Sequence, residues 1–347
     1  MGGFDVIGNP PPQGKPIPVA KRFERGLNGL AGRSSAPLAA GMLDSKGEQF
    51  YSAIPMSATD ARFEIGSVTK AMTGTLFGIM VERGDVDPHA PVDTILGASL
   101  PWRSRPPTLA ELASHQGGLP NTPTALWWRE AMTALGWSIK DPWRGVDAAA
   151  YATLLAKAAR TAKVGKKVSY SSMGVGLLGD ALAKVAGTDF ETLMNERLFG
   201  PLGMTRTGFN RPVHGADRVI VGINSKGRAV PYLHDQMPAA GMMASTTADL
   251  LRFLRAAWGE GPDPVVNGFR RALKPIARLG DVEIGYCWFL ASDQQGLRAF
   301  HPGGTWASQC EVVVVPQRRT ALAVLSATRR DIDSFVSEVL AEADDRV

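Results

Sequence analysis

Residues 63–74 read FEIGSVTKAMTG and place Ser67 three residues before Lys70, at the predicted start of a helix. Apolar residues then recur at helical spacing until Gly84. Residues three apart lie on one face of a helix, so we expect the lysine beside the serine hydroxyl. A serine becomes a nucleophile when a base takes its proton, and a lysine is such a base once burial or nearby cations lower its pKa. The alternative is a serine helix cap with a surface lysine.

The spacing alone is weak, because 20 serines and 12 lysines in 347 residues give about 0.7 Ser-x-x-Lys matches by chance. The chain lacks the Gly-x-Ser-x-Gly elbow of α/β-hydrolases, and its five histidines lie far from Ser67 in the sequence, so a Ser-His-Asp triad is disfavoured. A Gly-x-Gly-x-x-Gly match at residues 174–179 is followed by a helical segment, which favours helix packing over a dinucleotide site.

Composition is that of a globular protein, with 44% hydrophobic residues and a net charge of +5. The basic residues are scattered, which disfavours nucleic-acid binding, and no apolar run is long enough to span a membrane. The first residues lack signal-peptide features, so we expect a cytoplasmic enzyme. Cys287 and Cys310 lie in apolar stretches and are expected to be buried free thiols. No zinc-binding spacing occurs, and we expect no metal and no cofactor.

The pattern of elements divides the chain. Strand-like runs lie near both ends, at residues 37–43, 48–54, 283–290, 297–301, 310–316 and 320–327. Helical patterns occur at residues 19–32, 108–114, 124–136, 147–162, 173–186, 189–198, 247–257 and 331–345. We therefore predict an extended arm over 1–18, an α/β sheet domain from 19–84 and 256–347, and a helical domain over 85–255. This order suggests a mixed sheet built from both chain ends.

Two further segments carry candidate chemistry. Residues 167–174, KVSYSSMG, end an extended run and open a helix, with Tyr170 at the junction. Residues 300–306, FHPGGTW, lie between two late strands. Gly303 and Gly304 allow close backbone approach to a ligand, and the Gly304 amide is a candidate oxyanion donor. The alternatives are a core tyrosine and a simple turn.

Together these segments resemble the penicillin-recognising serine hydrolases, in their class C β-lactamase-like branch of D-Ala-D-Ala carboxypeptidases, D-amino-peptidases and family VIII esterases. FEIGSVTKAMTG looks like the Ser-x-x-Lys motif, residues 170–172 like Tyr-x-Asn, and residues 301–303 like Lys/His-x-Gly. Residues 109–120, 201–204 and 239–246 resemble collateral segments in the same order. The resemblance covers residues 35–330. It implies an α/β (α+β) fold of the β-lactamase/transpeptidase type: a central antiparallel sheet, flanking terminal helices and an inserted, mostly helical domain.

The resemblance also implies roles for individual residues. Ser67 attacks a carbonyl and becomes acylated, while Lys70 and Tyr170 share the work of the base. A cationic lysine lowers the tyrosine pKa, so that tyrosinate accepts the serine proton. Which of the two is the formal base stays open, because the pair titrates as a unit. The backbone amides of Ser67 and Gly304 form the oxyanion hole.

The chain departs from the family at two motifs. Ser172 stands where asparagine is usual, and His301 where lysine is usual. Both changes disfavour a dedicated β-lactamase, because a short hydroxyl and a neutral imidazole hold amide and carboxylate groups less well. Gly303 is assigned to substrate binding with these two. The tryptophan-rich segment around Trp128, with Trp306, is interpreted either as core packing or as an aromatic wall of the substrate pocket.

We therefore expect a serine hydrolase that cleaves carboxylic esters of small molecules through an acyl-enzyme. The alternatives are a D-amino-acid peptidase, an amidase or a β-lactamase, and an acyltransferase that uses the same acyl-enzyme. A non-catalytic binding protein of the same fold is disfavoured, because binding alone does not require Ser67, Lys70 and Tyr170 together.

Overall fold

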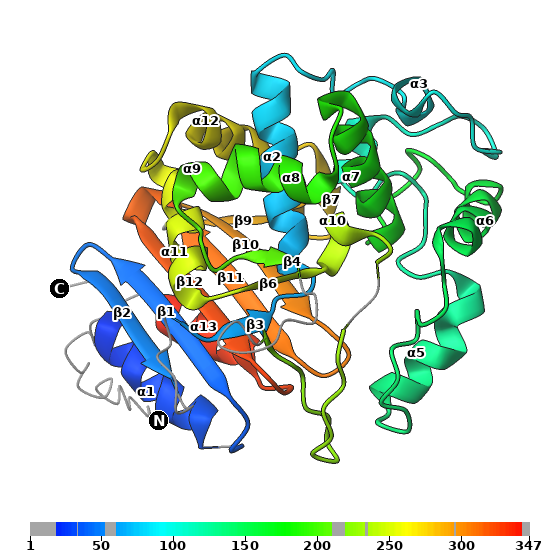
Figure 1. Cartoon of the computed structure of the whole chain (residues 1–347). Coiled ribbons are helices and arrows are strands. Elements are labelled where there is room, and N and C mark those ends of the chain that lie inside the picture. The colour runs from blue at the N-terminus through cyan, green and yellow to red at the C-terminus, as the bar shows by residue number, and fades with distance from the viewer. Residues whose placement is uncertain are drawn as a thin grey trace, which may run out of the picture.

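The computed structural model describes residues 19–32, 34–52, 60–209, 219–232, 235–294 and 296–341. The arm predicted for residues 1–18 and the last residues of the predicted C-terminal helix lie outside this part of the chain. Figure 1 shows the arrangement of the described elements, in which strands from early and late parts of the chain join in one large sheet.

The large sheet has eight strands in the order β2-β1-β12-β11-β10-β9-β8-β7. Their bounds are β1 Leu38–Asp44, β2 Gly47–Ser52, β7 Ala277–Leu279, β8 Val282–Ile284, β9 Phe289–Asp293, β10 Gly296–Gly304, β11 Gln309–Val315 and β12 Thr320–Ser326. Every pairing within it is antiparallel. The antiparallel sheet implied by the family resemblance is therefore confirmed, and the mixed sheet expected from element order was wrong. Antiparallel order needs only short hairpins along β8 to β12.

The terminal helices α1, Val19–Ala31, and α13, Ile332–Leu340, pack together over one face of this sheet (Figure 1). Alternate residues of a strand point to opposite faces. Leu38 and Met42 of β1 accordingly pack with the terminal helices, whereas Ala39 belongs to the core on the other side. Both faces of the central strands are therefore buried between helical layers. The flanking terminal helices implied by the family resemblance are confirmed.

The opposite face carries α2, Val68–Glu82, together with α11, Thr247–Arg255, and α12, Asp263–Ala272. Helix α2 is buried continuously from its first residue to Met80, so it lies at the centre of the molecule. A helix buried on all sides has no polar face, which explains why its apolar residues extend beyond a single stripe. This central position fixes α2 against strand β10 of the large sheet.

The remaining helices form the helical insert, of which α3, α5, α6 and α7 lie on the right of Figure 1, while α8 and α9 cross its upper part. They are α3 Val92–Leu96, α4 Leu109–Ala113, α5 Trp127–Ala134, α6 Ala148–Ala159, α7 Ser172–Ala186, α8 Phe190–Met194, α9 Gly200–Leu202 and α10 Pro238–Gly241. A small sheet in the order β4-β6-β3-β5 was not predicted; its strands are β3 Arg62–Glu64, β4 Gly208–Phe209, β5 Val219–Ile220 and β6 Met243–Ser245. Helix α11, assigned by sequence to the helical domain, packs on β1 and β12. The domain boundaries stay a prediction.

Two sequence interpretations have clear outcomes in the fold. The glycines of residues 174–179 lie in α7, where a Cβ on Gly179 would fall 2.3 Å from the Ala239 side chain, so they allow close helix packing as expected. The single strand predicted over 283–290 is wrong. It breaks between β8 and β9, where Cys287 adopts a φ of 56° and its amide bonds the Ala113 carbonyl instead of a neighbouring strand.

Candidate active site

Ser67 occupies the N-cap position of α2, but its side chain makes no capping hydrogen bond. Its Oγ instead accepts a hydrogen bond from Lys70 Nζ at 3.0 Å. Lys70 is only 1% exposed. The helix-cap and surface-lysine alternative is therefore wrong, because the hydroxyl is left for chemistry and the lysine is buried beside it.

The Lys70 ammonium is held from the opposite side by α10. Its Nζ donates to the Ala240 carbonyl at 2.6 Å. The Thr73 hydroxyl donates to the neighbouring Ala239 carbonyl at 2.7 Å, which fixes α10 against α2. Burial lowers the pKa of Lys70 from 10.5 to about 7, an effect that Cys287 partly offsets. A substantial fraction of this amine is therefore neutral near pH 7 and able to accept a proton.

The turn before Ser67 brings the start of α2 onto β10. Gly66 has a φ of +45°, and a Cβ at this position would lie 2.2 Å from the Gly304 carbonyl oxygen. Only glycine allows both this backbone conformation and this approach. Ser67 and Gly304 consequently line one cavity. Their amides as the oxyanion hole stay a prediction that this arrangement supports.

Tyr170 lies next to the same pair. Its hydroxyl hydrogen-bonds with Ser67, and Lys70 Nζ lies 4.9 Å from the centre of the tyrosine ring. Burial raises the pKa of Tyr170 above its ordinary value, while the hydrogen bond to Ser67 acts in the opposite direction. The expected lowering of the tyrosine pKa is therefore wrong, because desolvation of the phenolate dominates. In the free protein near pH 7, a substantial fraction of Lys70 is therefore neutral while Tyr170 is protonated.

His115, which the sequence analysis did not assign, holds the tyrosine in place. Its ring lies 4.7 Å from the Tyr170 ring, and its carbonyl accepts from the Ser169 amide at 2.8 Å. Burial lowers the pKa of His115 to about 3, so the imidazole is neutral. The residue has a φ of 61°, which no local sequence pattern signals.

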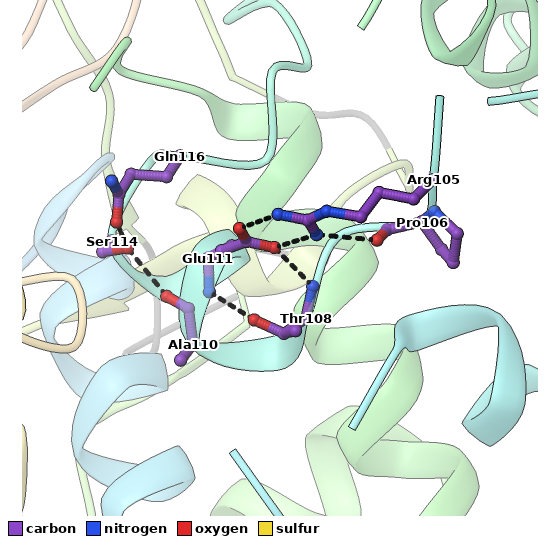
Figure 2. Close-up of polar contacts among 7 residues, drawn as sticks. All are labelled: Arg105, Pro106, Thr108, Ala110, Glu111, Ser114 and Gln116. Carbon is purple, nitrogen blue, oxygen red and sulfur yellow. Dashed lines mark hydrogen bonds and ion pairs between the residues drawn. The ribbon is translucent and has the colours of Figure 1, made fainter. Parts of the chain in front are cut away.

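This histidine follows α4, and Figure 2 shows the polar contacts at the start of that helix and at the residues on either side of position 115. Thr108 and Glu111 form a reciprocal capping box at the start of α4. Arg105 Nη1 donates to Glu111 at 2.7 Å, and the Ser114 hydroxyl bonds the Gln116 side chain at 3.0 Å. Hydrogen bonds on both sides of residue 115 thus fix the strained turn that supports Tyr170.

The site opens into a cavity of about 130 Å³. Five residues predicted from sequence line it: Ser67, Tyr170, Ser172, Gly304 and Trp306. Trp143, from the tryptophan-rich segment interpreted as core packing or as an aromatic wall, also lines it. Residues not predicted line it too, among them Asn121, Thr122, Glu130, Tyr232 and Thr305. Its walls are therefore partly aromatic and contain one carboxylate.

The other three predicted substrate-binding residues do not line this cavity. His301 is fully buried, its Nδ1 lies 2.6 Å from the Pro302 carbonyl oxygen, and burial lowers its pKa to about 3. Gly303 packs beneath the site, where a Cβ would fall 2.4 Å from the Ile65 carbonyl. Trp128 is 71% exposed on α5. Trp143, from the same tryptophan-rich segment, lines the cavity instead, because α5 turns the residue 128 side chain outward.

Ser172 is engaged by a residue from another segment. Its hydroxyl donates to Asn121 Oδ1 at 2.7 Å, and its amide donates to the same oxygen at 3.2 Å. With its carbonyl oxygen occupied by Ser172, the Asn121 side chain has its amide nitrogen available as a donor. A side-chain amide therefore exists in the cavity even though the second motif lacks its usual asparagine.

The described residues give further information on thiols, metals and membranes. Cys287 and Cys310 are buried free thiols, as predicted. Within the described ranges, no three histidine, cysteine, aspartate or glutamate side chains are grouped closely enough to hold a metal ion. None of the described helices combines the length and the apolar character needed to cross a bilayer.

Comparison with known proteins agrees with the fold and with the family that the sequence resembles. The sequence model of the Beta-lactamase family matches residues 32–345. The D-alanyl-D-alanine-carboxypeptidase/endopeptidase AmpH of Escherichia coli K12 is 27% identical over 203 residues, covering 56% of this chain and 49% of that protein. Among solved structures, the D-alanine carboxypeptidase AmpC from Burkholderia cenocepacia has a TM-score of 0.77 at 21% identity, covering 92% of this chain and 97% of that one.

A class C beta lactamase from Rhodobacter sphaeroides has a TM-score of 0.76 at 17% identity, covering 92% of this chain and 98% of that one. At these identities the solved structures establish the β-lactamase/transpeptidase fold. The chain belongs to the beta-lactamase family, a family of serine hydrolases. It spans about half the length of the curated relatives it matches.

Proposed function

We propose that this protein is a serine hydrolase that cleaves small carboxylic esters through an acyl-enzyme on Ser67. The observation that carries the proposal is the buried Lys70 amine, 3.0 Å from the serine Oγ and with a pKa lowered to about 7. A buried amine with this pKa is matched to proton transfer near neutral pH. A lysine with only a structural role does not require a buried position beside a serine hydroxyl or a lowered pKa.

In this mechanism, neutral Lys70 takes the proton of the Ser67 hydroxyl as Oγ bonds to the ester carbonyl carbon. The resulting oxyanion accepts hydrogen bonds from the Ser67 and Gly304 amides. Collapse of the intermediate breaks the bond to the leaving oxygen, which receives the proton from Lys70 through the Tyr170 hydroxyl. Water then attacks the acyl-enzyme and gives its proton to the same pair, and release of the acid returns that proton to Ser67.

The preference for esters rests on what faces the cavity. His301 is neutral and buried away from it, so the usual cation for a substrate carboxylate is missing from this position. Trp143, Trp306 and Tyr232 supply apolar surface. A volume of about 130 Å³ is on the order of the ~150 Å³ that accommodates a benzene-sized ligand, which suits a short acyl or alcohol group.

Cleavage of peptides or β-lactams is the second candidate. Its support is Asn121, whose side-chain amide faces the cavity beside Ser172 and is able to bind the carbonyl of an amide substrate. The carboxypeptidase and β-lactamase names of the similar proteins point the same way.

The test compares initial rates on a short-chain p-nitrophenyl ester and on a chromogenic cephalosporin, with Ser67→Ala as the blank. A large excess of ester over cephalosporin turnover supports the proposal, and a dominant cephalosporin rate favours the second candidate. Covalent labelling of Ser67 by a serine-reactive phosphonate distinguishes an enzyme from a binding protein. If Ser67→Ala still hydrolyses the ester, the acyl-enzyme mechanism on Ser67 is wrong.

A further inference from the structure

Glu130 of α5 is a carboxylate in the cavity that contains the nucleophile. The Thr122 hydroxyl donates to its Oε1 at 3.0 Å, and the Trp143 indole donates to the same oxygen at 3.3 Å. Two donors on one oxygen fix the orientation of the side chain. In the described part of the chain no protein donor engages Oε2, which is left for a ligand.

This carboxylate has no cationic partner among the described residues. The cavity lining contains Glu130 as its one carboxylate, and none of the described lining residues carries an ammonium or a guanidinium group. Burial raises the pKa of Glu130, and Asp141 adds to the rise, whereas the bonds from Thr122 and Trp143 act against it. A partly buried carboxylate without a counter-ion gains from any cation that enters the cavity.

Aromatic rings form the walls near this carboxylate. Trp143 bonds it directly, and Tyr232 packs edge-on against Trp306 with ring centres 5.4 Å apart. Aromatic faces attract ammonium groups, and tryptophan does so most strongly. A carboxylate combined with tryptophan and tyrosine rings is the usual protein environment for alkylammonium groups.

The groups behind the cavity wall include further negative charge. Glu64 is buried and accepts hydrogen bonds from the Tyr232 amide at 3.0 Å and the Thr305 hydroxyl at 2.8 Å. Two cations lie nearby. Lys70 is buried under Ser67, and the exposed Arg329 donates to the Thr305 carbonyl at 3.2 Å. Neither lines the cavity, so the group that meets a ligand directly is Glu130.

We propose that Glu130, with Trp143 and Tyr232, forms a subsite for an ammonium group, so that the substrates are esters carrying an alkylammonium group in the acyl or the alcohol part. This deepens the proposed ester hydrolysis and rests on it for the identity of the substrate. The subsite itself is a binding property, and its test does not depend on turnover.

The binding test uses an inactive protein and two isosteric ligands. Choline and 3,3-dimethyl-1-butanol have the same shape and differ in charge. Each is titrated into Ser67→Ala by calorimetry at about pH 8, where a carboxyl group is ionised. We expect choline to bind about tenfold to a hundredfold more tightly than the alcohol. Equal binding of the two ligands overturns the subsite.

A second variant assigns the effect to one residue. Glu130→Gln, made in the Ser67→Ala background, retains an oxygen acceptor for Thr122 and Trp143 but removes the charge. We expect the choline-to-alcohol affinity ratio to fall to about 1. The matched control is Glu24→Gln, an exposed acid on α1, which leaves the ratio unchanged. A ratio that survives Glu130→Gln also overturns the assignment. If that variant does not fold, the ligand pair on Ser67→Ala still decides the question.

Kinetics on the wild type then locate the ammonium group. Acetylcholine against 3,3-dimethylbutyl acetate tests the alcohol part. The p-nitrophenyl esters of 4-(trimethylammonio)butyrate and 5,5-dimethylhexanoate test the acyl part, with p-nitrophenyl hemiglutarate as the anionic member. A cationic ester with a higher kcat/KM than its neutral isostere shows whether the acyl or the alcohol part of the substrate carries the ammonium group. A preference for the anionic ester overturns the subsite. Choline selectivity without turnover of any ester overturns the esterase proposal alone.

Discussion

Replacing Lys70 by methionine is expected to stabilise the folded protein while abolishing its activity. Lys70 is almost completely buried, and burial lowers its pKa from 10.5 to about 7. A pKa that is lower in the folded state than in the unfolded state means that protonation of the buried amine opposes folding. Methionine has a similar length and flexibility and carries no charge, so it removes this penalty.

The size of the effect follows from the pKa difference. The pKa falls from 10.5 to about 7 on folding, and at about 1.36 kcal/mol for each unit this lowers the free energy of unfolding by about 5 kcal/mol. The full penalty applies below pH 7, where Lys70 is protonated in both the folded and the unfolded state. Between pH 7 and 10.5 only the unfolded state keeps the proton, so wild-type stability rises by about 1.4 kcal/mol per pH unit. Methionine leaves the Ala240 carbonyl without its donor, which costs about 1–3 kcal/mol. The variant should therefore gain about 2–4 kcal/mol near pH 6.

The assay is urea unfolding of wild type and Lys70→Met at about pH 6 and about pH 9. By pH 9 the remaining wild-type penalty is about 2 kcal/mol, so the advantage of the variant should shrink to near zero. Lys21→Met, on the exposed side of α1, is the control and should show no such pH dependence. A variant less stable than wild type at pH 6, or an advantage that does not change with pH, would refute the reasoning.

Further substitutions test other parts of the site. Tyr170→Phe should lower kcat by about 10²–10⁴-fold, and combining it with Lys70→Ala in steady-state assays should cost less than the sum of the single losses in activation free energy. Ser172→Asn should raise the ratio of cephalosporin to ester turnover, and an unchanged ratio would show that this position does not set the preference. Gly66→Ala should lower the unfolding free energy by at least about 3 kcal/mol, because its Cβ meets the Gly304 backbone. A wild-type melting curve for that variant would contradict the close approach.

The elements predicted from sequence were those whose pattern is local. Helix α2 and strands β11 and β12 follow from runs of apolar residues bounded by glycine, proline or charged residues. The Ser67 and Lys70 contact was also predictable, because residues three apart on a helix meet whatever the rest of the chain does. The break at Cys287 was not, since its positive φ results from a hydrogen bond to Ala113, far away in the sequence.

The walls of the cavity could be predicted only in part, because some of them are formed by contacts between residues far apart in the sequence. Tyr170 and Trp306 lie in recognisable motifs, whereas Glu130 and Trp143 are brought there by the packing of the helical insert. The tryptophan-rich segment signalled an aromatic wall, but not which side chain would turn inward. Trp128 on α5 is 71% exposed, whereas Trp143 in a turn after that helix is 3% exposed.

The neutral His301 and the open carboxylate oxygen of Glu130 have a common electrostatic consequence. In the family that the motifs resemble, a lysine is usual at position 301 and attracts a substrate carboxylate. This chain has a neutral histidine there that is buried behind the cavity. The open oxygen of Glu130 then determines the local charge that a substrate meets. An anionic substrate loses an attraction and gains a repulsion, and both changes act in the same direction. Introducing a lysine at 301 alone would therefore leave the repulsion by Glu130 in place, and we expect the selectivity of this cavity to depend on α5 as well as on β10.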